Sequence, residues 1–477
     1  MAARARVRYY YSIMSDKEDT ELIGGVEPEE EGTALGTLMK LRTTLLGAFG
    51  VMMVAVTLAS ALNYGFNIIM TKMLKGSGTF SDFYSLTSIF LIVTLGAVSV
   101  QTVVTKYVTE LHADGEEDKI RVLLRKFTRW LIYTSIVVIL LSVALAWPVA
   151  SLLKLKSPAF VIILGTAIAV TLFVTVPYGL LQGREQFVAL GGAAMAVATL
   201  RILVGVVLVL LGAGVYGALG AATVGTIIVI LVLMSSTRDM YRVPLKPVED
   251  FNPYRALWFL IPTVLAMFFI ILLTQIDAVL VKALFSKGQA DTYSYAALAG
   301  KAVLFFPEGI TLVMFPRVSQ LRAKGEPTKK ILYMSLAACT ALVGVIALFY
   351  LAFPKFTAKF FTPKGKYLSI VALKGPLGIP FISLFGIVMA IFAIVKLLAF
   401  YHLALERKAF IFLYAAAAAV EIVGIIMFHR SLTSVLTVML IVGLFLLVTN
   451  LALALFERPG KERIDDLSAP GAMPIQK

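Results

Sequence analysis

The strongest constraint on this chain is a series of apolar segments long enough to cross a lipid bilayer. The segments Leu45–Met70 and Phe83–Val104 each approach or exceed the roughly 20 apolar residues that a helix needs to cross about 30 Å of hydrocarbon. Hydrophobic residues make up 59% of the 477 residues and the mean hydropathy is +0.90, which is more apolar than a water-soluble core can absorb. In lipid, only helices and closed barrels satisfy every backbone polar group, and these segments lack the alternating pattern of barrel strands. The sequence therefore predicts an all-α integral membrane protein.

Twelve membrane-spanning helices are predicted along the chain. They cover residues 45–70, 83–104, 127–147, 158–181, 188–211, 214–234, 256–281, 293–316, 331–353, 376–402, 409–428 and 432–456. Loops on the side of the two termini carry more Lys and Arg than the opposite loops. This asymmetry predicts a protein of the cytoplasmic membrane with both termini in the cytoplasm. One outer loop opposes this pattern, because it holds Lys355, Lys359, Lys364, Lys366 and Lys374. Either this segment is an amphipathic piece on the outer surface, or a span near it has been miscounted.

The net charge of +15 raises the question of a nucleic-acid partner. The basic residues lie in short loops between apolar segments, with no basic stripe interleaved with aromatic residues, so we interpret the excess as a topology signal and expect no nucleic acid. Cys339 is the single cysteine and lies inside an apolar segment, so no disulfide or cysteine-based metal site can form within the chain.

The polar ends of the chain define its expected organisation. Residues 1–40 are rich in acidic side chains and do not resemble a cleavable signal peptide, so we expect a disordered cytoplasmic tail. A first six-helix bundle is expected at 41–235, a cytoplasmic linker at 236–255, a second bundle at 256–456, and a disordered tail at 457–477.

An internal repeat relates the two halves. The segment Val108-Thr-Glu-Leu-His-Ala-Asp-Gly-Glu after the second span matches Val318-Ser-Gln-Leu-Arg-Ala-Lys-Gly-Glu after the eighth. Trp147-Pro148 matches Phe353-Pro354, and the pattern of residues that follows Tyr178 recurs after Tyr401. The second half is longer than the first between these matches, and the additional residues fall in the lysine-rich loop. Because the matched loops are six spans apart, the halves run in the same direction, and we expect a pseudo-two-fold axis along the membrane normal. Chance similarity between Ala- and Leu-rich helices is the alternative.

Six ionisable residues fall well inside predicted spans: Arg201, Lys301 and Lys396, and the acids Asp277, Glu308 and Glu421. Each would cost roughly 2.5–3.5 kcal/mol at mid-membrane if it faced lipid, so most are expected to face a cavity or a partner. The spacing of seven places Lys301 and Glu308 on one face of a continuous helix. The repeat places Glu421 and Arg201 at similar depths in equivalent helices of the two halves. Structural ion pairs and a hydrated cavity between the halves both remain open interpretations.

Several function classes lack the residues they need. No GxxxxGK[ST] segment occurs, so the chain carries no ATP-hydrolysing phosphate loop, and no HExxH motif is present. His112, His402 and His429 have no metal-ligand spacing, so neither a metal nor a cofactor is expected. A membrane enzyme would need a carboxylate pair, metal cluster or activated nucleophile near the water interface, whereas the first outer loop offers only Asp82. We therefore expect no enzyme.

Four segments carry a family resemblance. They are Phe80-Ser-Asp-Phe-Tyr-Ser-Leu, Leu181-Gln-Gly-Arg-Glu-Gln-Phe, Gln275-Ile-Asp-Ala-Val-Leu-Val and Thr292-Tyr-Ser-Tyr-Ala. With twelve spans in two parallel halves, residues 40–456 resemble the polysaccharide-biosynthesis flippases of the multidrug/oligosaccharidyl-lipid/polysaccharide exporter superfamily. The major facilitator family shares the plan, but its usual GxxxDRxGRR-like loop is replaced here by Lys106-Tyr-Val-Thr-Glu-Leu-His-Ala-Asp-Gly.

The resemblance implies two six-helix bundles that rock about a central cavity and move a lipid-linked saccharide from the cytoplasmic to the outer leaflet. Family members are thought to use ion gradients, and a carboxylate on the seventh helix is often implicated, which Asp277 matches. The lipid II flippases of the superfamily have two further helices, for which this sequence has no room.

The function hypothesis is a monomeric flippase for lipid-linked oligosaccharide or polysaccharide precursors, working by alternating access among membrane lipids. Arg201, Lys301 and Lys396 are the candidates for binding the substrate pyrophosphate. Asp277, Glu308 and Glu421 are the candidates for binding a coupling proton or sodium ion. The alternative is a multidrug or toxic-compound cation antiporter of the same superfamily, whose cavity should be acidic and aromatic. A third possibility is a scaffold that organises glycan enzymes and moves nothing.

Overall fold

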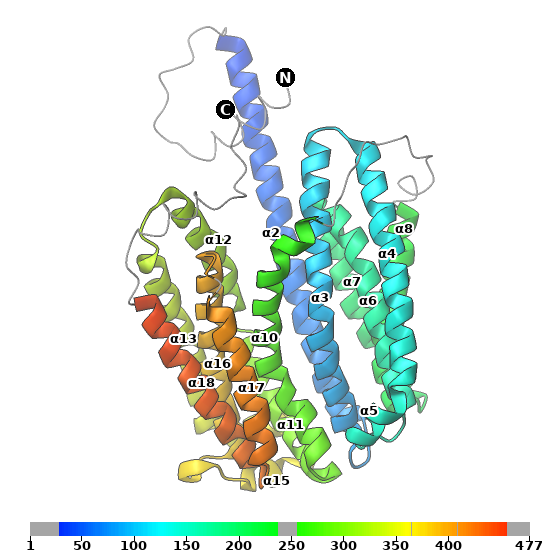
Figure 1. Ribbon diagram of the computed structural model, residues 1–477, viewed down its shortest axis with the longest axis vertical. Coiled ribbons are helices and arrows are strands. Elements are labelled where there is room, and N and C mark those ends of the chain that lie inside the picture. The colour runs from blue at the N-terminus through cyan, green and yellow to red at the C-terminus, as the bar shows by residue number, and fades with distance from the viewer. Residues whose placement is uncertain (1–27, 237–254, 364, 408, 456–477) are drawn as a thin grey trace. The chain divides into compact units, whose positions relative to one another are not determined.

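The computed structural model describes residues 28–236, 255–363, 365–407 and 409–455 (Figure 1). Within these residues all regular elements are helices, and the one isolated β-bridge joins Lys374 to Pro380. Of the tails expected to be disordered at 1–40 and 457–477 and the linker expected at 236–255, residues 1–27, 457–477 and 237–254 lie outside the described residues. The all-α prediction is confirmed for the described part of the chain.

Twelve segments in the described ranges are long and apolar enough to cross a membrane, which confirms the predicted number of spans. The first six are formed by α2 (Pro28–Met73), α3 (Thr79–Ala113), α4 (Glu117–Ala144), α6 (Ala159–Gly183), α7 (Phe187–Leu210) and α8 (Gly214–Ser236). The next six are α10 (Arg255–Leu284), α11 (Lys287–Lys301) together with α12 (Glu308–Lys324), α13 (Lys329–Ala352), α16 (Phe381–Ala404), α17 (Ala409–Met427) and α18 (Leu432–Leu455). Short elements connect them: α5 (Ala146–Leu152), η1 (Ala302–Leu304), α14 (Pro354–Phe361), α15 (Tyr367–Ala372) and η2 (Pro376–Gly378).

Helix α2 begins well before the predicted first span. It begins at Pro28, inside the segment that was expected to be a tail, and its most apolar part covers Gly50–Met73. The helix therefore extends beyond the segment that the hydrophobic pattern predicts.

The eighth span is discontinuous, which the hydrophobic pattern does not reveal. Helix α11 ends at Lys301, the 3-10 turn η1 follows, and α12 begins at Glu308. Pro307 explains the break, because proline lacks the N–H that a helix interior needs and its ring clashes with the preceding turn. The expectation that Lys301 and Glu308 share one helix face is therefore wrong, since it required a continuous helix.

The lysine-rich segment after the ninth span forms short helices rather than a further span. Helix α14 has 8 residues and α15 has 6, far fewer than a membrane crossing requires. Of the two interpretations of this segment, the miscounted span is excluded and the amphipathic surface piece is retained.

The chain divides into two compact units. Unit 1 comprises Met1–Phe66, Thr94–Trp147 and Pro158–Leu260; unit 2 comprises Asn67–Val93, Pro148–Ser157 and Ile261–Lys477. The division differs from the halves of the sequence in the segments 67–93 and 148–157, which pack with the second half. The pseudo-two-fold axis and the exact bundle boundaries stay predictions.

Unit 1 is held together by close helix contacts. Gly179 and Gly183 of α6 lie against Val104 and Val108 of α3, where an added Cβ would come within 2.7 Å and 2.6 Å of valine side-chain atoms. Small residues spaced by four allow two helices to approach closely in a membrane. An adjoining apolar core of α3, α4 and α6 includes the buried ring of Phe127.

Unit 2 surrounds α16, the most buried span. Helix α16 packs against α11, α12, α13 and α18. Gly386 of α16 lies against the Tyr350 ring of α13, and Tyr350 donates a hydrogen bond of 2.8 Å to the backbone oxygen of Ala299. The break after α11 is thereby fixed from the side by a packed tyrosine.

Candidate functional site

The break in the eighth span places two charges at helix ends within unit 2. Lys301 is the last residue of α11 and Glu308 is the first residue of α12. A cation at the C-terminal end of a helix and an anion at the N-terminal end are both stabilised by the helix dipole. Broken spans of this kind expose helix ends at membrane depth, where transporters place ion and substrate sites.

Lys301 forms a buried ion pair with Asp277 of α10. The Lys301 Nζ lies 2.8 Å from Asp277 Oδ1, and the two side chains are 5% and 0% exposed. Tyr293 of α11 donates a hydrogen bond of 2.8 Å to the other carboxylate oxygen, Oδ2. Lys301 also lies 3.4 Å from Gln275 Oε1 and 5.7 Å from the centre of the Tyr84 ring. Both oxygens of Asp277 are therefore bound by side chains from α11.

Glu421 of α17 adds a second carboxylate to this cluster. It is fully buried, and neither of its carboxylate oxygens has a hydrogen-bond partner among the described residues. Asp277, Lys301 and Tyr293 all lie within electrostatic range of it. Lys301 is therefore paired with Asp277, and the buried Glu421 carboxylate is a second acid within the electrostatic range of that pair. Because an uncompensated buried charge is costly, this cluster can bind one further positive charge, as a proton or a small cation.

A second polar network continues from this cluster along α3 and α10. Ser88 of α3 donates a hydrogen bond of 3.1 Å to Gln275 Oε1. Nearer the start of α3, Lys282 and Asp82 form an ion pair of 2.5 Å with side chains 2% and 1% exposed. The Lys282 ammonium also donates to Ser81 Oγ at 3.1 Å. Polar and charged groups therefore line the contact between α3 and α10 over several helical turns.

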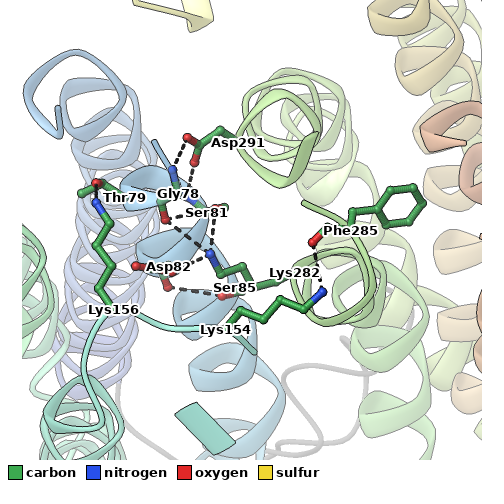
Figure 2. A network of polar contacts seen from close by, with 10 residues as sticks. All are labelled: Gly78, Thr79, Ser81, Asp82, Ser85, Lys154, Lys156, Lys282, Phe285 and Asp291. Atoms are coloured by element: carbon green, nitrogen blue, oxygen red, sulfur yellow. Dashed lines mark hydrogen bonds and ion pairs between the residues drawn. The ribbon is translucent and has the colours of Figure 1, made fainter. Parts of the chain in front are cut away.

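Figure 2 shows how this second network closes around the start of α3. Asp291 of α11 accepts hydrogen bonds from the backbone N–H groups of Gly78, at 2.6 Å, and Ser81, at 2.9 Å. The carboxylate therefore caps the positive end of α3 from a helix more than 200 residues away. Two lysines of the segment 148–157 extend the network, with Lys154 donating to the Phe285 backbone oxygen at 3.4 Å and Lys156 donating to Thr79 Oγ1.

The second network was missed at the level of sequence. Asp82 was placed in a loop, and Lys282 and Asp291 lie at the ends of predicted spans, where charged residues usually face water. The only available signal was the series of small hydroxyl residues around Asp82, namely Thr79, Ser81 and Ser85.

Glu308 and Lys396 form a separate ion pair in unit 2. The Lys396 Nζ lies 2.6 Å from Glu308 Oε1, and the side chains are 24% and 44% exposed, respectively. The greater exposure distinguishes this pair from the Asp277 cluster. The four predicted residues Asp277, Lys301, Glu308 and Lys396 thus form two lysine–carboxylate pairs.

Arg201 lies in unit 1 and pairs with neutral groups. Its Nη1 donates a hydrogen bond of 3.1 Å to Asn63 Oδ1, and its guanidinium lies 4.7 Å from the centre of the Phe66 ring. Both partners come from α2. Arg201 and Glu421 belong to different units, and the expectation that they approach each other stays a prediction.

The histidines are engaged in other contacts. His112 contacts Glu117 at 3.0 Å, and buried His402 contacts the Asn450 backbone oxygen at 3.3 Å. Among the described residues, no three His, Cys, Asp or Glu side chains come together as metal ligands.

Comparison with solved structures finds the same fold in membrane transporters. A multidrug resistance MATE family transporter of the MOP superfamily, in an inward-facing conformation, superimposes with a TM-score of 0.64 and 13% identity over 82% of this chain and 93% of that chain. The lipid II flippase MurJ gives a TM-score of 0.64 and 14% identity over 84% of this chain and 86% of that chain. A MOP superfamily transporter from Pyrococcus furiosus, whose binding pocket is described as having reversed polarity, gives a TM-score of 0.58 and 12% identity over 85% of this chain and 94% of that chain.

The family comparison concerns the sequence itself. No curated protein matches the chain at a significant level. The family model described as "Polysaccharide biosynthesis protein" matches residues 78–362, which is more than half of the chain and includes the second network and the Asp277–Lys301 pair, but not Glu421. With twelve candidate spans and a fold shared with multi-pass transporters, this match establishes that the chain is a membrane protein of the polysaccharide biosynthesis protein family.

Proposed function

We propose that this protein is a flippase that moves lipid-linked oligosaccharide or polysaccharide precursors across the cytoplasmic membrane by alternating access. Membership of the polysaccharide biosynthesis family and a fold shared with a lipid II flippase support this proposal. The observation that carries it furthest is the broken eighth span, with Lys301 at the end of one half-helix paired to Asp277, and a second buried carboxylate, Glu421, within electrostatic range of that pair. A transporter driven by an ion gradient needs such a group, whose charge can be changed by ion binding.

The substrate would be held by cations. A lipid-linked saccharide carries phosphate or pyrophosphate between lipid and sugar, and Arg and Lys are the residues that bind phosphate oxygens. Arg201, with neutral partners, would bind phosphate directly. Lys301 and Lys396 are each paired with a carboxylate in this structure.

Coupling follows from that pairing. When a proton or sodium ion neutralises Asp277 or Glu308, the partner lysine is released for a substrate phosphate. Glu421 is the strongest candidate for the coupling ion, because it has no ammonium of its own. Ion binding and substrate binding would then favour each other through the same ion pairs. The termini in this proposal face the cytoplasm.

Transport into the opposite leaflet of proteoliposomes tests the proposal. A fluorescent lipid-linked oligosaccharide that has crossed the bilayer becomes accessible to an impermeant glycosidase. The triple variant Arg201→Gln/Lys301→Gln/Lys396→Gln is expected to lose transport. The control variant Lys324→Gln/Lys330→Gln, which changes two exposed lysines and none of the candidate site residues, is expected to keep it. Intact transport by the triple variant would show that these cations do not bind the substrate.

A multidrug cation antiporter is the second candidate, because several solved structures with this fold are MATE transporters. The described charges disfavour it, since two of the three intramembrane carboxylates that could receive an organic cation are already paired with lysines. Dye efflux and drug-induced pH changes in the same vesicles separate the two candidates. Dye transport without saccharide-lipid transport would establish the antiporter.

A further inference from the structure

The short helix α14 and the chain around it have an unusual charge composition. Five lysines lie between Phe353 and Pro380, and no Asp or Glu occurs anywhere between Glu326 and Glu406. Lys355 and Lys359 are exposed, and neither makes a hydrogen bond or ion pair with a described residue. Among the described residues, no acidic side chain pairs with Lys355 or Lys359 on this surface.

Helix α14 presents three different faces, each made by residues four apart. Thr357 and Phe361 are buried, and the helix packs through them against unit 2, where α11 and α16 are its neighbours. Phe356 and Phe360 form a second face and are 61% and 49% exposed. Lys355 and Lys359 form the third.

The aromatic face continues the surface of the preceding span. Phe349 near the end of α13 lies 5.2 Å from Phe353 and 6.0 Å from Phe356, measured between ring centres, and Phe353 is also exposed. The span formed by α13 ends at Ala352, and α14 begins two residues later. Continuity with a membrane-spanning surface indicates that lipid, rather than water, covers these rings. Aromatic residues favour the depth at which the hydrocarbon meets the headgroups.

We propose that α14 lies in the membrane interface and that Lys355 and Lys359 bind the phosphate groups of anionic phospholipids. Phenylalanines on one face enter the bilayer, and the adjacent lysine face meets the headgroups, as in interfacial amphipathic helices. The packed face made by Thr357 and Phe361 ties the lipid contact to α11, which carries Lys301. Anionic lipid is therefore placed to stabilise the helix that ends at the break. The proposal does not depend on which leaflet faces the outside or on the substrate.

Spin labels test the position of α14 in full-length protein. Cys339 is the only cysteine and is buried, so a Cys339→Ala background permits single cysteines at chosen sites. In liposomes of phosphatidylglycerol and phosphatidylcholine, labels replacing Phe356 or Phe360 should be relaxed more by oxygen than by a water-soluble nickel chelate. Labels replacing Lys355 or Lys359 should show the reverse. Greater nickel accessibility at the aromatic sites, or protection from both reagents, would overturn the placement in lipid.

Lipid titration tests the phosphate contact. Native mass spectrometry of the purified protein should show phosphatidylglycerol binding that weakens about tenfold in Lys355→Gln/Lys359→Gln, since lysines near an anionic surface each add to binding. Phosphatidylcholine binding should not change. Lys355→Arg/Lys359→Arg should retain the affinity, and the control Lys324→Gln/Lys330→Gln should resemble the unmodified protein.

Two results would contradict this assignment. Equal losses in the test and control pairs would mean a general charge effect. Tight binding of soluble inorganic pyrophosphate, abolished by the same two substitutions, would mean a site for a substrate phosphate rather than for the lipid surface.

Discussion

The two buried lysine–carboxylate pairs on α10 differ in their charge balance. Asp82 is paired with Lys282, whose ammonium also donates to Ser81 Oγ, and Lys156 lies in electrostatic range of the same carboxylate. Lys301 and Asp277, only one or two helical turns away, lie within electrostatic range of a second carboxylate, that of Glu421. A balanced network holds helices in one arrangement, whereas an unbalanced one responds to an added positive charge. The comparison supports the proposal that the first pair is structural and that the second takes part in ion binding.

The largest expected effect is on transport, and it tests whether Glu421 distinguishes the two lysine–carboxylate pairs. Glu421→Gln removes the carboxylate that is proposed to bind the coupling ion, so ion-gradient-driven transport should be lost while the free energy of unfolding changes by no more than about 1 kcal/mol. Proteoliposome transport with and without an imposed gradient, together with thermal unfolding in detergent, measures both. Full gradient-driven transport in this variant would assign coupling to another group.

The next effect is on stability and concerns the balanced network. Lys282→Met leaves Asp82 buried without its ammonium, which should lower the free energy of unfolding by about 3–5 kcal/mol. The double variant Asp82→Asn/Lys282→Met should recover most of that loss, because both charges are gone. If the single and double variants are equally unstable in detergent, the loss comes from packing and not from the unpaired charge.

A smaller effect on stability is expected at Tyr293, and it tests whether the Asp277 carboxylate in the unbalanced cluster is charged. Tyr293→Phe removes the hydrogen bond to Asp277 Oδ2 and should cost about 1.5–3 kcal/mol, the range for a hydrogen bond to a charged group. Tyr350→Phe, which removes a bond to a neutral backbone oxygen, is the matched control and should cost about 0.5–1.5 kcal/mol. A larger loss for Tyr350→Phe would contradict a charged Asp277.

The smallest effect is expected for the partly exposed pair. Glu308→Gln should change the free energy of unfolding by less than about 1 kcal/mol, because we expect the exposed side of this pair to face a hydrated cavity, where water screens an ion pair. Comparing it with Lys282→Met under identical conditions measures how far burial separates the two kinds of pair. A loss as large as that of Lys282→Met would place the Glu308 carboxylate in an environment as dry as the Asp82 network.

Much of the architecture could be predicted because lipid leaves few alternatives for the backbone. Apolar segments such as Phe83–Val104 can only be helical, so the number and order of spans followed from hydropathy alone. The discontinuity at Pro307 was not predicted, because a proline inside an apolar segment is tolerated when neighbouring residues satisfy the backbone. Whether it breaks a helix depends on the packing of neighbouring helices, and here the Tyr350 hydroxyl binds the backbone oxygen of Ala299 close to the end of α11.

The candidate site was predicted only in part. All six intramembrane charges could be identified, because each is costly in lipid and therefore conspicuous among apolar neighbours. Their pairing could not be predicted, since Lys301 could have faced Glu308 seven residues later and instead contacts Asp277 on another helix. Asp82 and Lys282 were overlooked because charges near span ends usually reach water.

The sequence by itself determined that this chain crosses the membrane as helices, that charged groups lie within those helices, and which family it resembles. Those properties depend on side-chain transfer energies and local patterns along the chain. Only the tertiary structure decided which charges are paired, which carboxylate is left without an ammonium, and that Lys355 and Lys359 stand beside an exposed aromatic face. These depend on contacts between residues far apart in sequence, such as Asp291 with the start of α3, which no local pattern encodes.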